Sequence, residues 1–101
     1  MVVEINDNNV EEIIKNNEKV VIDCFAPWCG PCKMLSPVID ELASELETVK
    51  FYKLNVDDNE QTARNYGIMS IPTVLFFENG SLKEKSVGFR TKEELKEFLG
   101  E

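Results

Sequence analysis

An apolar run at residues 20–25, Val-Val-Ile-Asp-Cys-Phe, restricts the fold of this chain more than any other feature. Its length suits a single β-strand, and its apolar residues are nearly continuous instead of alternating with polar ones. A strand of that kind is buried on both faces, as in a parallel sheet that helices cover on each side. The run therefore predicts a central strand of an α/β fold, with Asp23 as its one charged residue.

Strand and helix signals alternate along the rest of the chain. Further strands are expected at residues 2–5, 49–56, 73–77 and 82–87. Helices are expected at residues 10–14 (behind a cap at Asp7 or Asn8), from Cys29 through an apolar stripe at residues 35–46, at residues 59–66 and at residues 91–99. A helix joins strands 20–25 and 49–56, which should make them parallel, whereas Asn79-Gly80 indicates an antiparallel hairpin. These signals predict a mixed sheet of about five strands in the order βαβαβαββα, flanked on both faces by about four helices.

Length and charge narrow the possible functions. A chain of 101 residues is at the small end of domain size, so we expect one domain spanning residues 1–101. Its formal net charge of −8 would repel phosphate backbones, which disfavours nucleic-acid binding. Residues 1–7 show no leader pattern, and no apolar run approaches the length of a membrane span. We therefore expect a cytoplasmic monomer that binds neither nucleic acid nor membranes.

The cysteines indicate redox or metal chemistry. The chain has three cysteines and no histidine, which removes imidazole bases, Cys-His nucleophile pairs and mixed Cys/His zinc sites. Cys29 and Cys32 enclose Gly30-Pro31 where the strand at residues 20–25 ends and the next helix begins. A helix N-terminus favours a thiolate, and cysteines one turn apart can form a disulfide.

This placement predicts a thiol-disulfide exchange reaction. The Cys29 thiolate would attack a substrate disulfide, and Cys32 would then resolve the mixed disulfide and release a reduced product. A purely structural disulfide and a zinc site completed by a carboxylate are the alternatives, and no metal is expected.

Two residues, Asp23 and Lys53, are candidates for supporting roles near the dithiol, and Cys24 is the third cysteine. Asp23 is a carboxylate in an apolar strand, which biases its pKa upward and makes it a candidate proton acceptor for Cys32, although it could be an ordinary buried Asp. Lys53 could pair with Asp23 across the sheet, or it could be a solvated surface lysine. Cys24 is expected to pack as a small hydrophobic side chain.

Four blocks of sequence carry a family resemblance. They are Val21-Ile22-Asp23-Cys24-Phe25-Ala26-Pro27-Trp28-Cys29-Gly30-Pro31-Cys32-Lys33-Met34, then residues 53–57, residues 66–73, and Asn79-Gly80 with Val87-Gly88. In order and spacing they resemble the thioredoxin family from about residue 2 to residue 100. The resemblance implies the thioredoxin fold and a protein-disulfide reductase that uses its own redox-active disulfide and no other cofactor. It also implies an electron-donor role in cell redox homeostasis and gives Asp23 its proton-accepting role.

The same resemblance implies partners and a substrate surface. The partners would be a thioredoxin reductase and disulfide-containing clients such as peroxiredoxins and other reductases that need a dithiol donor. The family places a cis peptide at Ile71-Pro72, facing the dithiol, so that the Ile71 backbone can pair with an extended substrate and Pro72 excludes metal. The active-site loop would include Trp28, Gly30 and Pro31, and the apolar substrate rim would consist of Trp28, Ile68, Ile71, Pro72, Val87 and Gly88.

Several alternative functions and structural interpretations remain open from the sequence. A non-catalytic docking subunit of the same fold, a metal-binding protein, and a disulfide-forming or isomerising enzyme are the competing functions. Ile71-Pro72 could also be an ordinary strand start. Met69 falls at a position that varies within the family, and Lys83 and Lys85 are expected to protect an edge strand.

Overall fold

A computed structural model describes residues 2–101, so Met1, the first residue of the predicted domain, lies outside it. The elements are β1 (Val3–Ile5), α1 (Val10–Asn16), β2 (Lys19–Phe25), α2 (Gly30–Glu45), β3 (Lys50–Asn55), α3 (Glu60–Asn65), β4 (Thr73–Glu78), β5 (Ser81–Val87) and α4 (Lys92–Phe98). Their order confirms the predicted βαβαβαββα arrangement. None of the helices within residues 2–101 is long and apolar enough to cross a membrane.

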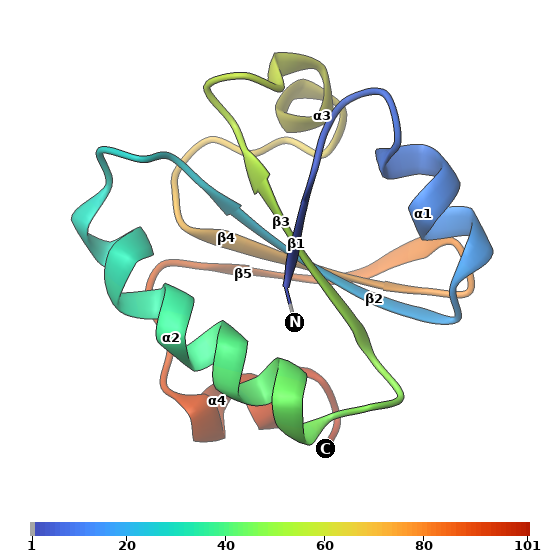
Figure 1. Cartoon of the computed structure of the whole chain (residues 1–101), viewed down its shortest axis with the longest axis vertical. Coiled ribbons are helices and arrows are strands. Elements are labelled where there is room, and N and C mark those ends of the chain that lie inside the picture. Colours follow the sequence, from blue (N-terminus) through green and yellow to red (C-terminus); the bar gives the residue numbers. More distant parts are fainter. Residues whose placement is uncertain (1) are drawn as a thin grey trace.

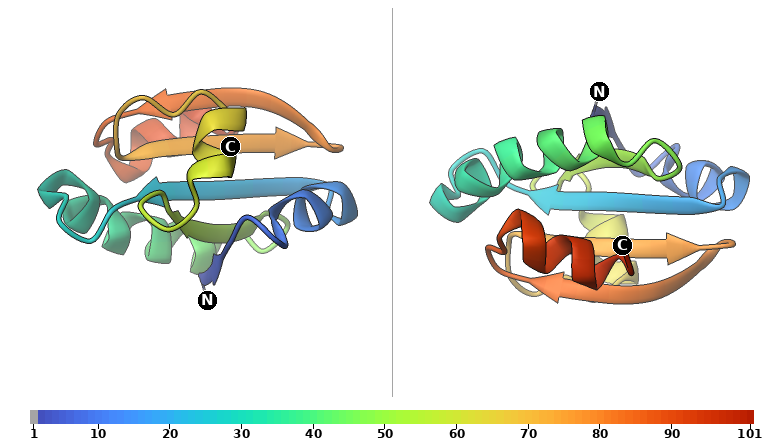
Figure 2. Two further views of the ribbon diagram at one scale, coloured as in Figure 1. Left: turned by 90° about the horizontal axis from the view of Figure 1, so that it is seen from above. Right: turned by 90° about the horizontal axis from the view of Figure 1, so that it is seen from below.

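The strands form one mixed sheet in the order β1-β3-β2-β4-β5 (Figure 1). β1 and β2 run parallel to β3, whereas β4 is antiparallel to both β2 and β5. Figure 2 shows the arrows of β2 and β4 pointing in opposite directions. Residues 20–24 of β2 are all buried, which confirms the central strand that the apolar run predicts.

Helices cover both faces of the sheet. On one face Leu35, Ile39 and Leu42 of α2 pack with Leu95 of α4 against β2, β3 and β4. On the other face Val10 and Ile14 of α1 pack with Tyr66 and Ile68, which follow α3. Cys24 of β2 lies within this second cluster, fully buried, as expected for a small hydrophobic side chain. The two clusters together form an α/β sandwich with β2 at its centre.

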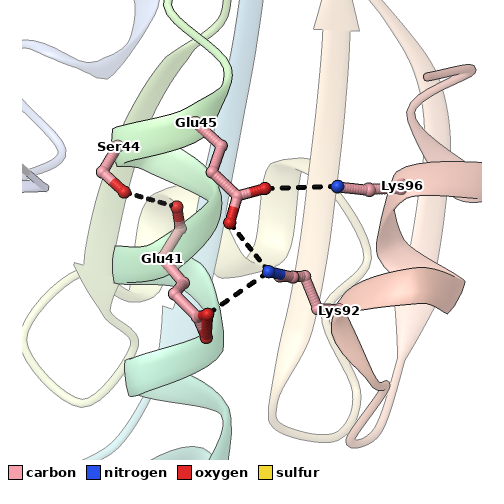
Figure 3. A network of polar contacts seen from close by, with 5 residues as sticks. All are labelled: Glu41, Ser44, Glu45, Lys92 and Lys96. Carbon is pink, nitrogen blue, oxygen red and sulfur yellow. Dashed lines mark hydrogen bonds and ion pairs between the residues drawn. The ribbon is translucent and has the colours of Figure 1, made fainter.

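An ion-pair network joins α2 to α4 (Figure 3). Lys92 Nζ lies 2.7 Å from Glu45 Oε2 and 3.3 Å from Glu41 Oε1, and Lys96 Nζ lies 3.2 Å from Glu45 Oε1. The two ammonium groups hold the pKa of Glu45 below its usual value. The same helix α4 begins with the predicted capping box, in which Thr91 and Glu94 exchange side-chain and backbone hydrogen bonds.

Two turns show how local sequence sets the chain path. Asn79 and Gly80, with φ of 53° and 84°, make the predicted β4–β5 hairpin turn, since both adopt the left-handed conformation that a type I′ turn requires. The prediction of Asp7 or Asn8 as the cap of α1 is wrong, because the N-cap is Asn9. The carboxylate of Asp7 instead accepts hydrogen bonds from Thr62 in α3, which offers it both a backbone N–H and a hydroxyl.

Candidate active site

Cys29 and Cys32 lie where β2 leads into α2. Cys29 is the N-cap residue of α2, and its Sγ accepts a hydrogen bond of 3.2 Å from the Cys32 backbone N–H. The two sulfurs are joined in a disulfide, with 5.2 Å between the Cα atoms. Gly30 and Pro31 occupy the first two helical positions. Pro31 has no backbone N–H, but at this position an N–H would have no hydrogen-bond partner within the helix. The predicted dithiol geometry is therefore present.

The local environment stabilises a thiolate at Cys29 once the disulfide is reduced. The dipole of α2 contributes roughly 0.3–1 kcal/mol near its N-terminus. A hydrogen bond from the Cys32 N–H to a charged sulfur is worth about 1.5–3 kcal/mol, so this bond outweighs the dipole. Cys29 and Cys32 are 5% and 4% exposed, and because burial disfavours a charged sulfur, the hydrogen bond and the dipole must offset that cost.

Asp23 lies in β2 beneath the dithiol. It is 4% exposed, and its Oδ1 has no hydrogen-bond partner among the described residues. Burial raises the pKa of Asp23 to about 7, while the positive charge of Lys53 opposes this rise. Asp23 and Cys32 line the same pocket of about 160 Å³, together with Lys53 and Ser36. A group that exchanges its proton near neutral pH thus lies beside the second cysteine.

Lys53 lies directly across from Asp23 in the parallel β2–β3 register. No ion pair within 4.0 Å joins the two side chains in the described part of the chain, although Lys53 is the main group that lowers the Asp23 pKa. The expected partnership is therefore a charge effect through the pocket that both residues line, and it is not a direct contact.

The loop before β4 reaches the dithiol. The Ile71-Pro72 peptide bond is cis, and the Ile71 carbonyl oxygen lies 3.9 Å from Cys29 Sγ. Thr73 Oγ1 donates a 2.6 Å hydrogen bond to the Ser70 carbonyl, and Gly88 N–H donates one of 2.8 Å to the Pro72 carbonyl. These bonds fix the loop backbone beside Cys29.

A groove of about 490 Å³ opens next to this loop. Its walls come from the loop before α2, the end of β3, helix α3 and the loop before β4, and they include Trp28, Val56, Ala63, Ile68, Met69 and Ile71. Trp28, Ile68 and Ile71 of the predicted rim are thus brought together. Val87 and Gly88 are not among the lining residues and lie instead beside Pro72, which is itself buried.

Contacts between distant parts of the chain hold this groove in shape. Trp28 Nε1 donates a 2.9 Å hydrogen bond to Asp57 Oδ2, which orients an indole that is 71% exposed. Lys85 Nζ of β5 donates to the carbonyl oxygens of Tyr66 and Gly67, at 3.1 and 3.2 Å. Neither Asp57 nor Lys85 carries a sequence signal for such a role. The indole N–H of a Trp can donate one hydrogen bond and a helix end favours a cation, but neither pattern names the partner.

The arrangement supports one chemistry above others. A cysteine pair at the start of a helix, a buried carboxyl beside the second cysteine and an open groove beside the first define a thiol-disulfide oxidoreductase. No cluster of three or more His, Cys, Asp or Glu side chains suited to a metal occurs within residues 2–101. A family model described as Thioredoxin matches residues 1–101. The chain belongs to the thioredoxin family.

Curated relatives agree with this family. A thioredoxin of Haemophilus influenzae is 44% identical over 102 residues, covering 99% of this chain and 95% of that protein. A thioredoxin of Bacillus subtilis is 51% identical over 81 residues, covering 79% of this chain and 78% of that protein. The chloroplastic thioredoxin M-type of Pisum sativum is 50% identical over 95 residues, covering 92% of this chain and 55% of the pea protein. The chain is a thiol-disulfide oxidoreductase of the thioredoxin type.

Proposed function

We propose that this chain reduces disulfide bonds in client proteins by two successive exchanges. The Cys29 thiolate attacks a client disulfide, forming a mixed disulfide and releasing one client thiolate. Cys32 then attacks Cys29 Sγ, which releases the second client thiolate and leaves the Cys29–Cys32 disulfide. The electrons travel in this cysteine pair, so the cycle uses no other cofactor. The hydrogen bond from Cys32 N–H to Cys29 Sγ is the observation that carries the proposal.

Asp23 acts as the proton acceptor for Cys32 in the second exchange. Its carboxyl shares the pocket with Cys32, and its pKa of about 7 lets it take up or release a proton at neutral pH. Lys53 modulates this step through its charge, since it opposes the rise in the Asp23 pKa.

Clients bind in an extended conformation along the Ile71-Pro72 loop and the groove beside it. The Ile71 backbone pairs with the client, and Trp28 and Ile68 contact its apolar side chains. Gly30 and Pro31 complete the active-site loop, while Val87 and Gly88 extend the surface beyond Pro72. Pro72 itself occupies the position that would keep a metal ion from the thiols.

The partners and cellular setting follow from the same chemistry. A thioredoxin reductase would regenerate the dithiol, and peroxiredoxins and reductases that need a dithiol donor would be the clients. We place the protein in the cytoplasm, where thiols are kept reduced, as a monomer of one domain over residues 1–101 that binds neither nucleic acid nor membranes. Cell fractionation and light scattering test the location and the monomeric state.

Trapping experiments test the two cysteine roles. In Cys32→Ser the first exchange proceeds but the second cannot, so mixing with an insulin disulfide should accumulate a covalent complex through Cys29. Cys29→Ser is the control that should form no complex, and Cys24→Ser should turn over like the unmodified protein because Cys24 is buried outside the site. If Cys32→Ser forms no complex, the proposed order of attack is wrong. A chain that shows no reduction with any variant would instead be a docking subunit.

A further inference from the structure

Met69 is the most exposed large apolar side chain of the described residues. It is 95% exposed and lines the same groove as Trp28. Its backbone is held close to the dithiol, because the Ser70 carbonyl accepts from Thr73 Oγ1 and the Ile71 carbonyl lies 3.9 Å from Cys29 Sγ. A flexible thioether therefore projects into solvent from a fixed loop, two residues from the backbone that meets the reactive sulfur.

This position combines two properties of methionine. An exposed, polarizable thioether adapts to differently shaped apolar partners, which suits a surface that receives many clients. It is also readily oxidised to a sulfoxide, which is polar and chiral, and exposure promotes that reaction. The same side chain thus offers both contact area and a point of chemical change.

We propose that Met69 is an oxidation site through which peroxide weakens client docking while the Cys29–Cys32 pair stays competent for exchange. The proposal rests on the proposed function, because it takes the groove as the client site. The oxidant is a peroxide: its O–O bond breaks, one oxygen bonds to the Met69 sulfur, and the sulfur gives up two electrons. The remainder of hydrogen peroxide leaves as water. In the disulfide form of the protein, Cys29 and Cys32 have no thiolate to compete for the oxidant.

Met34 provides a comparison within the same chain. It lies in α2, is 62% exposed and is not among the residues that line the groove. Peroxide should reach both thioethers, but only the change at Met69 should alter the groove. A functional effect that follows Met69 and not Met34 therefore separates a change in docking from general oxidative damage.

The experiment treats the disulfide form with hydrogen peroxide, removes the oxidant and then reduces the dithiol with dithiothreitol, which is removed in turn. Peptide mapping by mass spectrometry quantifies the added oxygen at each methionine. The reduced protein is then mixed with either insulin or glutathione disulfide, and alkylation at set times gives a second-order rate constant for each. Met69→Leu and Met34→Leu pass through the same treatment, and each is compared with its own untreated form.

The proposal predicts a rate constant for insulin that falls about threefold to tenfold after treatment, whereas the constant for glutathione disulfide, which has no polypeptide segment to fill the groove, stays within about twofold. In Met34→Leu the rate constant for insulin should fall by the same factor after treatment. In Met69→Leu the rate constant for insulin after treatment should match that of its own untreated form. Complete oxidation of Met69 without a lower insulin rate overturns the proposal, as does an equal loss in Met69→Leu. If untreated protein reduces neither disulfide, the proposed function is wrong, and this inference, which rests on it, is wrong as well.

Discussion

Burial of Asp23 beneath the dithiol couples the stability of this protein to pH. Its pKa rises from 3.8 in the unfolded chain to about 7 in the folded one, so between these values the folded state holds a proton that the unfolded state has lost. Stability therefore falls as pH rises through this window. The gap in pKa corresponds to about 4 kcal/mol once the pH is well above 7.

Replacing the carboxyl by an amide should remove this penalty. In Asp23→Asn we expect the free energy of unfolding at pH 8 to rise by about 2 kcal/mol, because a buried amide without a partner keeps part of the cost. The gain should shrink toward zero by pH 5, and urea unfolding at both pH values measures it. The exposed Glu47→Gln is the control and should change stability by less than about 0.5 kcal/mol. The introduced amide cannot accept the Cys32 proton, so an unchanged rate of mixed-disulfide resolution would contradict the role assigned to Asp23.

Single residues also show what sequence can and cannot reveal. Cys29, Cys32 and the Asn79-Gly80 turn could be predicted because their roles depend on neighbours within a few positions. The hydrogen bond from Trp28 to Asp57 spans 29 positions, and the one from Thr62 to Asp7 spans 55. Such pairs are set by how the sheet and helices pack, and no local pattern identifies them.

At the scale of elements, β5 supports one wall of the groove through Lys85. The expectation for Lys83 and Lys85 was protection of the sheet edge, and β5 is indeed an edge strand. Lys85 Nζ also binds the carbonyl oxygens of Tyr66 and Gly67 at the end of α3, just before the groove residue Ile68. Lys83 has a different partner, since it pairs with Glu78 at 3.1 Å.

Removing the ammonium group of Lys85 should weaken the wall of the groove at the end of α3. Lys85→Met should lower the free energy of unfolding by about 1 kcal/mol, since two exposed hydrogen bonds are lost, and reduce the rate with insulin about twofold to fivefold. Lys85→Arg should restore most of that rate, because a guanidinium can donate to the same carbonyls. Lys83→Met is the matched control. If it slows insulin reduction as much as Lys85→Met does, the effect belongs to the edge strand in general.

The elements themselves were predicted with small errors at their ends. Periodicity is local, so each strand and helix had its own signal, and the observed bounds differ from the expected ones by few residues at most termini. The N-cap of α1 was predicted wrongly because of a tertiary contact. The Asp7 carboxylate accepts its hydrogen bonds from Thr62 in α3 and not from the first turn of α1. Val87 and Gly88 are expected in the rim around Cys29, and the register of β5 places Val87 across from Thr73, with Gly88 bonded to the Pro72 carbonyl; their part in the rim stays a prediction.

For the whole molecule, the topology followed from a few general rules. A buried central strand, a helical crossover to a parallel neighbour and a hairpin near the end leave few possible sheets, and the observed order β1-β3-β2-β4-β5 is one of them. The groove and the pocket at Asp23 could not be predicted in the same way. The groove arises where the loop before α2 meets the segment from α3 to the loop before β4, and the pocket lies between β2, the first turns of α2 and Lys53 of β3.

The reduction potential of the Cys29–Cys32 pair tests the central claim most directly. The protein is equilibrated in defined thiol-disulfide buffers and read by the fluorescence of Trp28, with Cys29→Ser as the control that should show no transition. A disulfide reductase requires a reversible two-electron transition at the reducing end of the thiol-disulfide scale, which is the result we predict. A midpoint at the oxidising end would instead identify an enzyme that forms or rearranges disulfides, and the absence of a reversible transition would contradict a redox role altogether.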